Sequence, residues 1–262
     1  MNTMRRIPGP LPHEDHPNGD GHIGMVHSWD MSTGVDGPGT RFVLFLNGCP
    51  LRCLYCSNPD TWHLRDGRRM DVEEVMDKIT ACRDFLLATG GGVTVTGGEP
   101  LLQARFVEAV LIRCRELGLH TALDTSGFLG ARAGDRLLAA TDLVLLDIKS
   151  FDRIDYRRLT GRELAPTLAF ARRLAAADIP VWLRFVLVPQ STENAAMIDA
   201  LAAFAAELGN VERVDVLPFH KLGAAKYDEL GIVFPLRDTP PPTIELVDRV
   251  RAQFRAHGLR AY

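Results

Sequence analysis

The chain has 262 residues, of which 46% are hydrophobic and 24% charged, as expected for one globular α/β domain. Its formal net charge of −3 excludes a general electrostatic attraction to nucleic acid or to an anionic membrane surface. No run approaches the roughly 18 apolar residues of a membrane-spanning helix, so we expect neither nucleic acid nor membrane as a partner.

The first residues predict a tail rather than a secretory signal. Pro, Asp, Glu and His stand where such a signal needs an apolar stretch. We therefore expect a mobile tail over residues 1–22, a single domain over residues 23–262 and a cytoplasmic location. The five cysteines agree with a reducing compartment, because an odd number with only Cys82 and Cys114 outside one short cluster argues against a disulfide framework.

Apolar, β-branched runs alternate with helical patterns along the rest of the chain. An antiparallel lead-in strand is predicted at 25–33. Further strands are predicted at 41–47, 93–96, 120–124, 142–148, 181–188 and 212–217. Helices are predicted near 71–87, 102–117, 131–140, 165–177, 193–208 and 243–257. This alternation predicts a parallel sheet covered by helices, with too few units to close an eight-stranded barrel.

Three cysteines lie within eight positions directly after the first of these parallel strands. Cys49, Cys53 and Cys56 follow the spacing C-x3-C-x2-C. A structural zinc site would need a fourth protein ligand, for which the nearest histidine is His63. Three thiolates of one tight loop suit a cubane iron–sulfur cluster better, because each thiolate holds one iron and the remaining iron stays open to a small molecule.

Polar residues follow the carboxyl end of every predicted parallel strand, which is where the chemistry of such sheets gathers. Each has a structural explanation when taken alone, such as a turn for Gly97 and Gly98, a helix cap for Asp124 or a loop position for His220. Their coincidence at one edge of the sheet favours a functional site. These strand-end residues are Cys49, Gly97, Gly98, Glu99, Asp124, Thr125, Asp147, Lys149, Arg184 and His220.

The cysteine spacing, with Tyr55 before the last cysteine, resembles that of the radical S-adenosylmethionine (SAM) enzymes. The resemblance implies an open (β/α)6 partial TIM barrel and a [4Fe-4S] cluster on the three cysteines whose open iron chelates SAM. From about residue 23 onward, the chain most resembles one group of these enzymes, the activating enzymes of glycyl radical enzymes. Within that group it most resembles the pyruvate formate-lyase branch. The segments that carry it include "GVDGPGTRFVLFLNGC", "YCSNPDTW", "GGGVTVTGGEP", "LDTSGF", "DLVLLDIK", "RFVLVP" and "ELGNVERVDVLPFHKLGAAKY".

The resemblance also implies how SAM is held. The glycines of the turn at 96–100 let bare backbone approach the SAM amino group, with Glu99 nearby. Lys149 and His220, the implied catalytic residues, hold the carboxylate and the ribose, and Tyr55 packs near the adenine. The full set of implied SAM contacts is Tyr55, Ser57, Asn58, Gly97, Gly98, Glu99, Asp147, Ile148, Lys149 and His220.

Two carboxylates at neighbouring strand ends, Asp124 and Asp147, are costly unless a cation or hydrogen bonds offset their repulsion. The resemblance implies that a bound monovalent cation offsets this repulsion. Its implied ligands are Asp124, Thr125, Asp147 and the carbonyl of Leu145. The resemblance further implies that Asp36 and Arg184 anchor a flexible loop of the partner enzyme, although Asp36 has an equally good interpretation as a turn former.

The implied activity is reductive cleavage of SAM to a 5′-deoxyadenosyl radical, which abstracts a Cα hydrogen from one glycine of the partner. Flavodoxin or ferredoxin would donate the electron to a monomeric enzyme. Two residues favour a different target. Ser57 stands where the pyruvate formate-lyase branch usually has His, and Ser57 and Pro100 both resemble activating enzymes of other glycyl radical enzymes. Those enzymes commonly carry further cysteine clusters, whereas the 40 or so residues between Cys56 and Gly97 hold only Cys82.

Three alternatives stay open at this point. The chain could activate another glycyl radical enzyme, or it could be a radical SAM enzyme that acts on a small molecule. The segment "LPFHKLGAAKY" argues against the small-molecule alternative. A zinc-stabilised protein without catalytic activity is the third.

Overall fold

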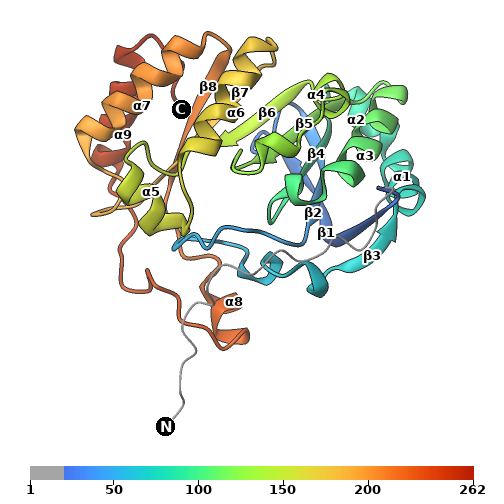
Figure 1. Ribbon diagram of the computed structural model, residues 1–262, viewed down its shortest axis with the longest axis horizontal. Coiled ribbons are helices and arrows are strands. Elements are labelled where there is room, and N and C mark those ends of the chain that lie inside the picture. The colour runs from blue at the N-terminus through green and yellow to red at the C-terminus, as the bar shows by residue number, and fades with distance from the viewer. Residues whose placement is uncertain (1–20) are drawn as a thin grey trace. The chain divides into compact units, whose positions relative to one another are not determined.

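The computed structural model describes residues 21–262, shown as a ribbon in Figure 1. Apart from its last two residues, the tail predicted at 1–22 lies outside the described residues. The strands are β1 (Ile23–Thr33), β2 (Thr40–Leu46), β3 (Arg68–Asp71), β4 (Gly92–Gly97), β5 (His120–Thr125), β6 (Leu143–Asp147), β7 (Val181–Leu187) and β8 (Val211–Pro218). They form an open sheet in the order β3-β1-β2-β4-β5-β6-β7-β8.

The helices are α1 (Val72–Ala81), α2 (Arg83–Ala88), α3 (Ala104–Glu116), α4 (Asp135–Ala139), α5 (Arg153–Thr160), α6 (Ala165–Ala176), α7 (Ala195–Leu208), α8 (Ala224–Glu229) and α9 (Ile244–Ala256). All seven predicted strands are present, within about two residues. The single helix predicted at 71–87 is wrong, because the chain breaks at Cys82 into α1 and α2. The helix predicted at 131–140 is shorter than expected, since a 3-10 turn occupies Gly130–Arg132.

Strand directions agree with the sequence. β1 runs antiparallel to β2, as the lead-in strand was expected to do, and β3 adds a second antiparallel strand at that edge. β2 with β4, β4 with β5, and β7 with β8 pair in parallel. The predicted α/β class with an open, mainly parallel sheet is confirmed.

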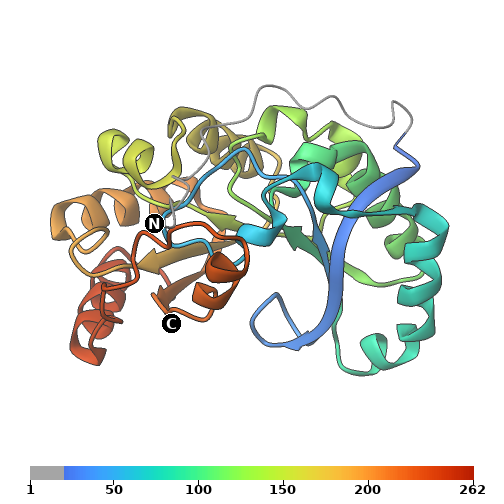
Figure 2. The ribbon, with the colours of Figure 1, turned by 90° about the horizontal axis from the view of Figure 1, so that it is seen from below.

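Two compact units divide the described chain. We call residues 21–50 and 61–145 the N-terminal unit, and residues 51–60 and 146–262 the C-terminal unit. In the N-terminal unit α3 packs against α1 and α4; in the C-terminal unit α7 packs against α6 and α9, the last seen beside α7 in Figure 2. The single domain expected over residues 23–262 stays a prediction.

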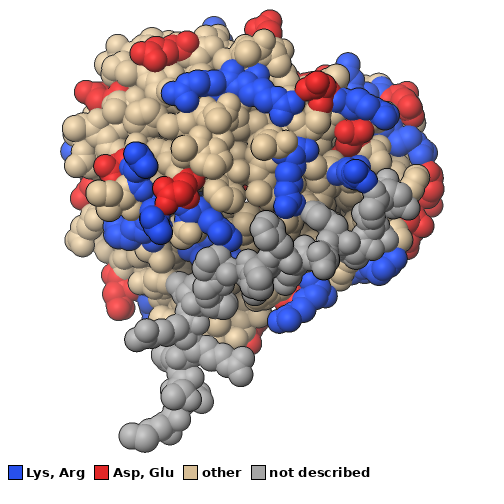
Figure 3. Space-filling view, in the orientation of Figure 1, with Lys and Arg blue, Asp and Glu red and all other residues tan. Residues whose placement is uncertain are grey.

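The surface carries charges of both signs. In Figure 3, Lys and Arg lie interspersed with Asp and Glu, in keeping with the formal net charge of −3. Over residues 21–262, no helix combines the length and the apolar composition needed to cross a membrane.

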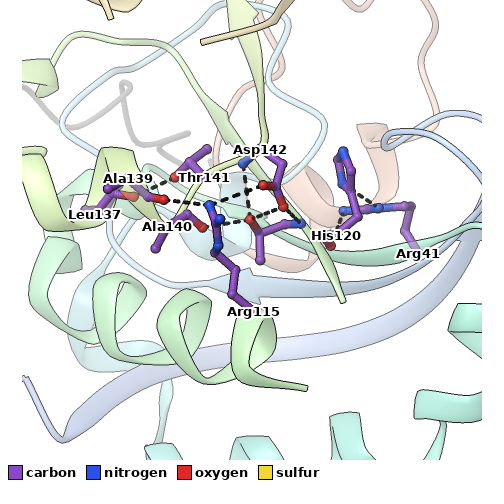
Figure 4. A network of polar contacts seen from close by, with 9 residues as sticks. Arg41, Arg115, His120, Leu137, Ala139, Ala140, Thr141 and Asp142 are labelled. Atoms are coloured by element: carbon purple, nitrogen blue, oxygen red, sulfur yellow. Dashed lines mark hydrogen bonds and ion pairs between the residues drawn. The ribbon is translucent and has the colours of Figure 1, made fainter. Parts of the chain in front are cut away.

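A buried arginine contacts the amino ends of neighbouring strands of the N-terminal unit, and Figure 4 shows its contact with His120 at the start of β5. The Arg41 guanidinium is inaccessible to solvent and donates to Thr94 Oγ1 at 3.0 Å and to the His120 carbonyl at 3.2 Å. Arg41 Nη1 also lies 3.1 Å from Nδ1 of His120. Because the guanidinium has only donors, this ring nitrogen must be the acceptor. Burial lowers the pKa of His120 and Arg41 lowers it further, against the opposing charge of Asp142.

This contact predicts a loss of stability in acid. Between the lowered folded pKa of His120 and the unfolded value of about 6.5, the unfolded chain binds more protons, so the free energy of unfolding falls as the pH falls. We expect the melting temperature to drop between about pH 7 and pH 5. In His120→Asn, whose amide oxygen still accepts from Arg41, the drop should be smaller. Circular dichroism melts at constant ionic strength measure both; equal pH dependence in the two proteins would contradict the assignment.

Candidate active site

The cysteine loop spans the boundary between the two units along the chain. Cys49 ends the first segment of the N-terminal unit, and Cys53 and Cys56 belong to the C-terminal unit. All three are half-buried thiols outside any disulfide. The pKa of the Cys53 thiol is raised to about 12, chiefly by burial, with Cys56 and Asp147 adding to the rise and Lys149 opposing it. The thiol therefore stays protonated until a metal displaces its proton.

Three thiols on one short loop fit an iron–sulfur cluster. Within residues 21–262, no three side chains of His, Cys, Asp or Glu gather closely enough to hold one metal ion. A cubane cluster needs no such convergence, since each thiolate binds a separate iron. The monovalent cation expected at Asp124, Thr125, Leu145 and Asp147 stays a prediction.

Residues 51–60 of this loop are held within the C-terminal unit. Two carbonyl groups at the end of α5 accept backbone hydrogen bonds from the loop: Thr160 from Arg52 at 2.8 Å, and Leu159 from Leu54 at 2.9 Å. The amide of Cys56 donates to the carbonyl of Cys53 at 3.1 Å, which closes a tight turn between the two cysteines. The spacing C-x2-C therefore has a defined backbone conformation.

The predicted SAM contacts Asp147 and Lys149 form an ion pair beside Tyr55. Lys149 Nζ lies 3.0 Å from Asp147 Oδ2, with the side chains 13% and 18% exposed, and 5.8 Å from the Tyr55 ring centre. Burial alone would lower the pKa of Lys149, but Asp147, Tyr55 and Cys53 raise it well above its usual value, so the ammonium stays charged.

The Tyr55 hydroxyl is buried and has no hydrogen-bond partner in the described part of the chain. Such a group costs about 1–3 kcal/mol when it is left unsatisfied. A bound molecule with a polar atom at this point would satisfy it. This observation fits the predicted contact between Tyr55 and SAM.

The turn after β4 owes its two glycines to backbone packing. Gly97 has a φ of +118°, and a Cβ there would lie 2.2 Å from the amide nitrogen of Leu46. A Cβ on Gly98 would lie 2.4 Å from the carbonyl oxygen of Gly48. Gly98 and Glu99 donate backbone hydrogen bonds to these same residues, Leu46 and Gly48. The turn is thus fixed against the backbone that leads into Cys49.

Glu99 ties this turn to the loop after β5. Its carboxylate is 1% exposed and accepts from Thr125 Oγ1 at 2.6 Å, Ser126 Oγ at 2.5 Å, Ser126 N at 3.0 Å and Leu101 N at 3.1 Å. Burial raises the pKa of Glu99, and the hydrogen bonds oppose the rise. No sequence pattern indicated these bonds, and a contact between Glu99 and SAM stays a prediction.

Of the remaining predicted residues, Asp124 and His220 lie at or just after the ends of β5 and β8. Arg184 lies in the middle of β7, so its predicted position at the strand end is wrong. Asp124 Oδ2 accepts from Thr96 Oγ1 at 2.7 Å, within the N-terminal unit. In the C-terminal unit, the backbone of Ile148 donates to the carbonyl of Arg184 at 3.3 Å. His220 is exposed, and its Nδ1 accepts from the amide of Leu222 at 3.4 Å.

Asp36 lies half-buried in the turn between β1 and β2. Its carbonyl oxygen accepts from Thr94 Oγ1 at 2.6 Å, so its backbone has a structural role in the turn. The roles of Asp36 and Arg184 as anchors for a partner peptide stay predictions.

Sequence reasoning assigned no role to α8, although its segment stood out as specific. Lys226 and Tyr227 of α8 contact the loop just after Cys56, through Asn58, Asp60 and the Cys56 carbonyl. The available signal was the unusual segment "LPFHKLGAAKY", within which only His220 received a function.

Comparison with known proteins identifies the class. Residues 43–202 match the model of the radical SAM superfamily, a span that includes the cysteine loop, the turn after β4 and the Asp147–Lys149 pair. The chain belongs to the radical SAM superfamily, and the open sheet is of that type.

Within the superfamily the likeness is specific. The chain is 40% identical over 238 residues to the pyruvate formate-lyase 1-activating enzyme of Escherichia coli K12, covering 90% of this chain and 97% of that protein. It is 43% identical over 231 residues to the pyruvate formate-lyase-activating enzyme of Staphylococcus aureus USA300, covering 86% and 92%. A crystal structure of a domain of the Bacteroides vulgatus pyruvate-formate lyase-activating enzyme is 28% identical, with a TM-score of 0.56 over 66% of this chain and 98% of that one.

Proposed function

We propose that this protein activates a glycyl radical enzyme, and that its target is pyruvate formate-lyase. The observation that carries the proposal is the 40% identity to a pyruvate formate-lyase 1-activating enzyme, which extends over 97% of that protein. The absence of further cysteine clusters between Cys56 and Gly97 supports the same branch. Ser57 and Pro100 favour the second candidate, an activating enzyme for another glycyl radical enzyme.

When bound, the cluster and SAM supply the reductive cleavage that gives methionine and a 5′-deoxyadenosyl radical, which takes a Cα hydrogen from a glycine of the partner. Cys49, Cys53 and Cys56 hold the cluster. Lys149 orients the SAM carboxylate while Asp147 keeps the ammonium charged, and the buried Tyr55 hydroxyl supplies a hydrogen bond nearby. In these roles the residues bind and orient the cluster and SAM, and they do not themselves react.

Other SAM and cation contacts belong to the same proposal. Backbone of the turn at Gly97 and Gly98 faces the amino group, and His220 holds the ribose. Asp124, Thr125, Asp147 and the carbonyl of Leu145 bind a monovalent cation. The hydrogen bond from Thr96 already offsets part of the negative charge on Asp124.

The partners are inferred from the chemistry. Flavodoxin or ferredoxin donates the electron, Asp36 and Arg184 anchor the glycine-bearing loop, and the enzyme acts as a monomer. The cytoplasm is the proposed location, supported by five cysteines that all remain thiols within the described residues.

The test is to mix the reduced enzyme and SAM anaerobically with candidate partners and to record electron paramagnetic resonance (EPR) spectra. We expect the doublet of a glycyl radical on pyruvate formate-lyase. A radical that forms only on a dehydratase or decarboxylase partner would replace the target with the second candidate. If SAM is cleaved and no protein radical forms on any of these partners, a small-molecule substrate is indicated instead.

A further inference from the structure

We propose that Lys226 and Tyr227 of α8 are positioning residues that hold the end of the cysteine loop in the conformation needed to bind the cluster. The inference rests on the proposed function only in requiring that a cluster is bound. It concerns the C-terminal unit alone, because α5, α8 and residues 51–60 all belong to that unit.

Lys226 binds two loop residues at once. Its Nζ lies 2.9 Å from Asn58 Oδ1, 2.9 Å from Asp60 Oδ2 and 3.1 Å from Asp60 Oδ1. An ammonium group has three donors, so these oxygens can occupy all of them. The side chains of Lys226 and Asp60 are 34% and 27% exposed, which shields the pair partly from water. In the chain, Lys226 is 166 positions from Asp60 and 168 positions from Asn58.

Tyr227 reaches the last cysteine itself. Its hydroxyl donates to the carbonyl oxygen of Cys56 at 3.1 Å. The ring is fully buried and packs on Phe234 with ring centres 4.8 Å apart, so the hydroxyl has a fixed direction.

A third contact comes from the residue before α8. A Cβ on Gly223 would lie 2.6 Å from the carbonyl oxygen of Ser57, so the backbone at residue 223 packs directly on the loop. Lys226, Tyr227 and Gly223 thus meet three consecutive parts of the segment 56–60. The α5 carbonyls of Leu159 and Thr160 hold earlier residues of the loop, Leu54 and Arg52.

Together, α5 and α8 bracket the two cysteines of the C-terminal unit. The α5 contacts fix the backbone on both sides of Cys53, at Arg52 and Leu54, and the α8 contacts fix Cys56 and the residues after it, up to Asp60. A ligand set has to be held within about 0.5 Å of its productive geometry. Loss of the α8 contacts should therefore weaken cluster binding even where the fold survives.

The experiment compares reconstituted holoenzymes. Lys226→Met keeps most of the side-chain length but removes the ammonium, Lys226→Arg keeps donors and charge, and Tyr227→Phe removes one hydroxyl. Lys221→Met is the matched control: Lys221 lies in the same segment, but its Nζ donates to the carbonyl of Arg237. The readouts are iron loss to a chelator, the EPR spectrum of the reduced cluster with and without SAM, and the melting temperature of the apoprotein.

We expect Lys226→Met to lose iron about 10-fold faster than the unsubstituted protein, as for outer partners of metal ligands. Tyr227→Phe should lose it about fivefold faster, in line with one hydrogen bond. Both should change the EPR spectrum, while Lys226→Arg and Lys221→Met stay close to the unsubstituted protein. Unchanged iron loss and spectra in both Lys226→Met and Tyr227→Phe would overturn the proposal, even if the melting temperature falls.

Tyr227→Phe keeps the test decisive if Lys226→Met does not fold, since it removes a single atom from a packed ring. Equally fast iron loss from Lys221→Met would overturn the proposal as well. The readouts need no partner enzyme. Failure of the unsubstituted protein to bind iron would overturn the proposed function, whereas normal binding in all variants would overturn this inference alone.

Discussion

Replacing any one of Cys49, Cys53 and Cys56 with Ala should remove the iron–sulfur absorption of the anaerobically reconstituted protein. It should also reduce SAM cleavage by more than about 100-fold, because a direct thiolate matters more than the outer partners of metal ligands. The apoprotein should stay folded, since all three side chains are only half-buried. Iron content, visible absorption and circular dichroism measure these effects separately.

The control is the double variant Cys82→Ala/Cys114→Ala. Burial raises the pKa of the Cys114 thiol to about 12, and burial also raises the pKa of Cys82, so both stay protonated. Cys114 is fully buried and packs as a small apolar side chain, so its loss should cost about 1 kcal/mol of stability. Iron content should remain that of the unsubstituted protein. Iron loss from this double variant would show that the ligand assignment is wrong.

Lys149→Ala should lower both the stability and the affinity for SAM. The ion pair with Asp147 is largely buried, and removal of one partner from such a pair costs about 3 kcal/mol. The 3.0 Å contact with Asp147 gives Lys149 a part in the stability of the fold beside its predicted contact with SAM. Urea denaturation of the apoprotein gives the first effect, and isothermal titration with SAM gives the second.

The double variant Asp147→Asn/Lys149→Met separates the two roles. It removes both charges together, so it should recover much of the lost stability while SAM binding stays weak. If Lys149→Ala unfolds at the same urea concentration as the unsubstituted protein, the pair does not stabilise the fold. If the double variant binds SAM normally, neither side chain contributes to the binding site.

The sequence predicted the elements that are long and strongly patterned. Four shorter features were not predicted in this way, one of them the eight-residue helix α5. The strand β3 has four residues, of which only Met70 is buried, and it exists because it pairs with residues 23–26 of β1. The six residues of α8 are too few to show a helical period. At Cys82 neither Gly nor Pro marks the break between α1 and α2.

In the candidate site, too, some features could be predicted from the sequence and others could not. Local motifs were visible in the sequence, because the cysteine spacing and the glycine turn are each set within a few residues. Contacts between distant segments were not visible in the sequence. The hydrogen bonds from Thr125 and Ser126 to Glu99 span 26 and 27 positions, and the bond from Lys226 to Asn58 spans 168. Nothing in the local pattern at Glu99 or Lys226 indicates which residue each one meets.

The four bonds to Glu99 also bear on how this chain can be recombined with its relatives. A chimera that takes the turn at 96–100 from one parent and the loop at 124–127 from another inherits a buried carboxylate and its donors from different sources. A loop without side-chain hydroxyls at positions 125 and 126 would leave that buried carboxylate with only two of its four donors, the backbone amides of residues 101 and 126, at a cost of about 1–3 kcal/mol. The two segments, separate in sequence, form a single exchangeable block.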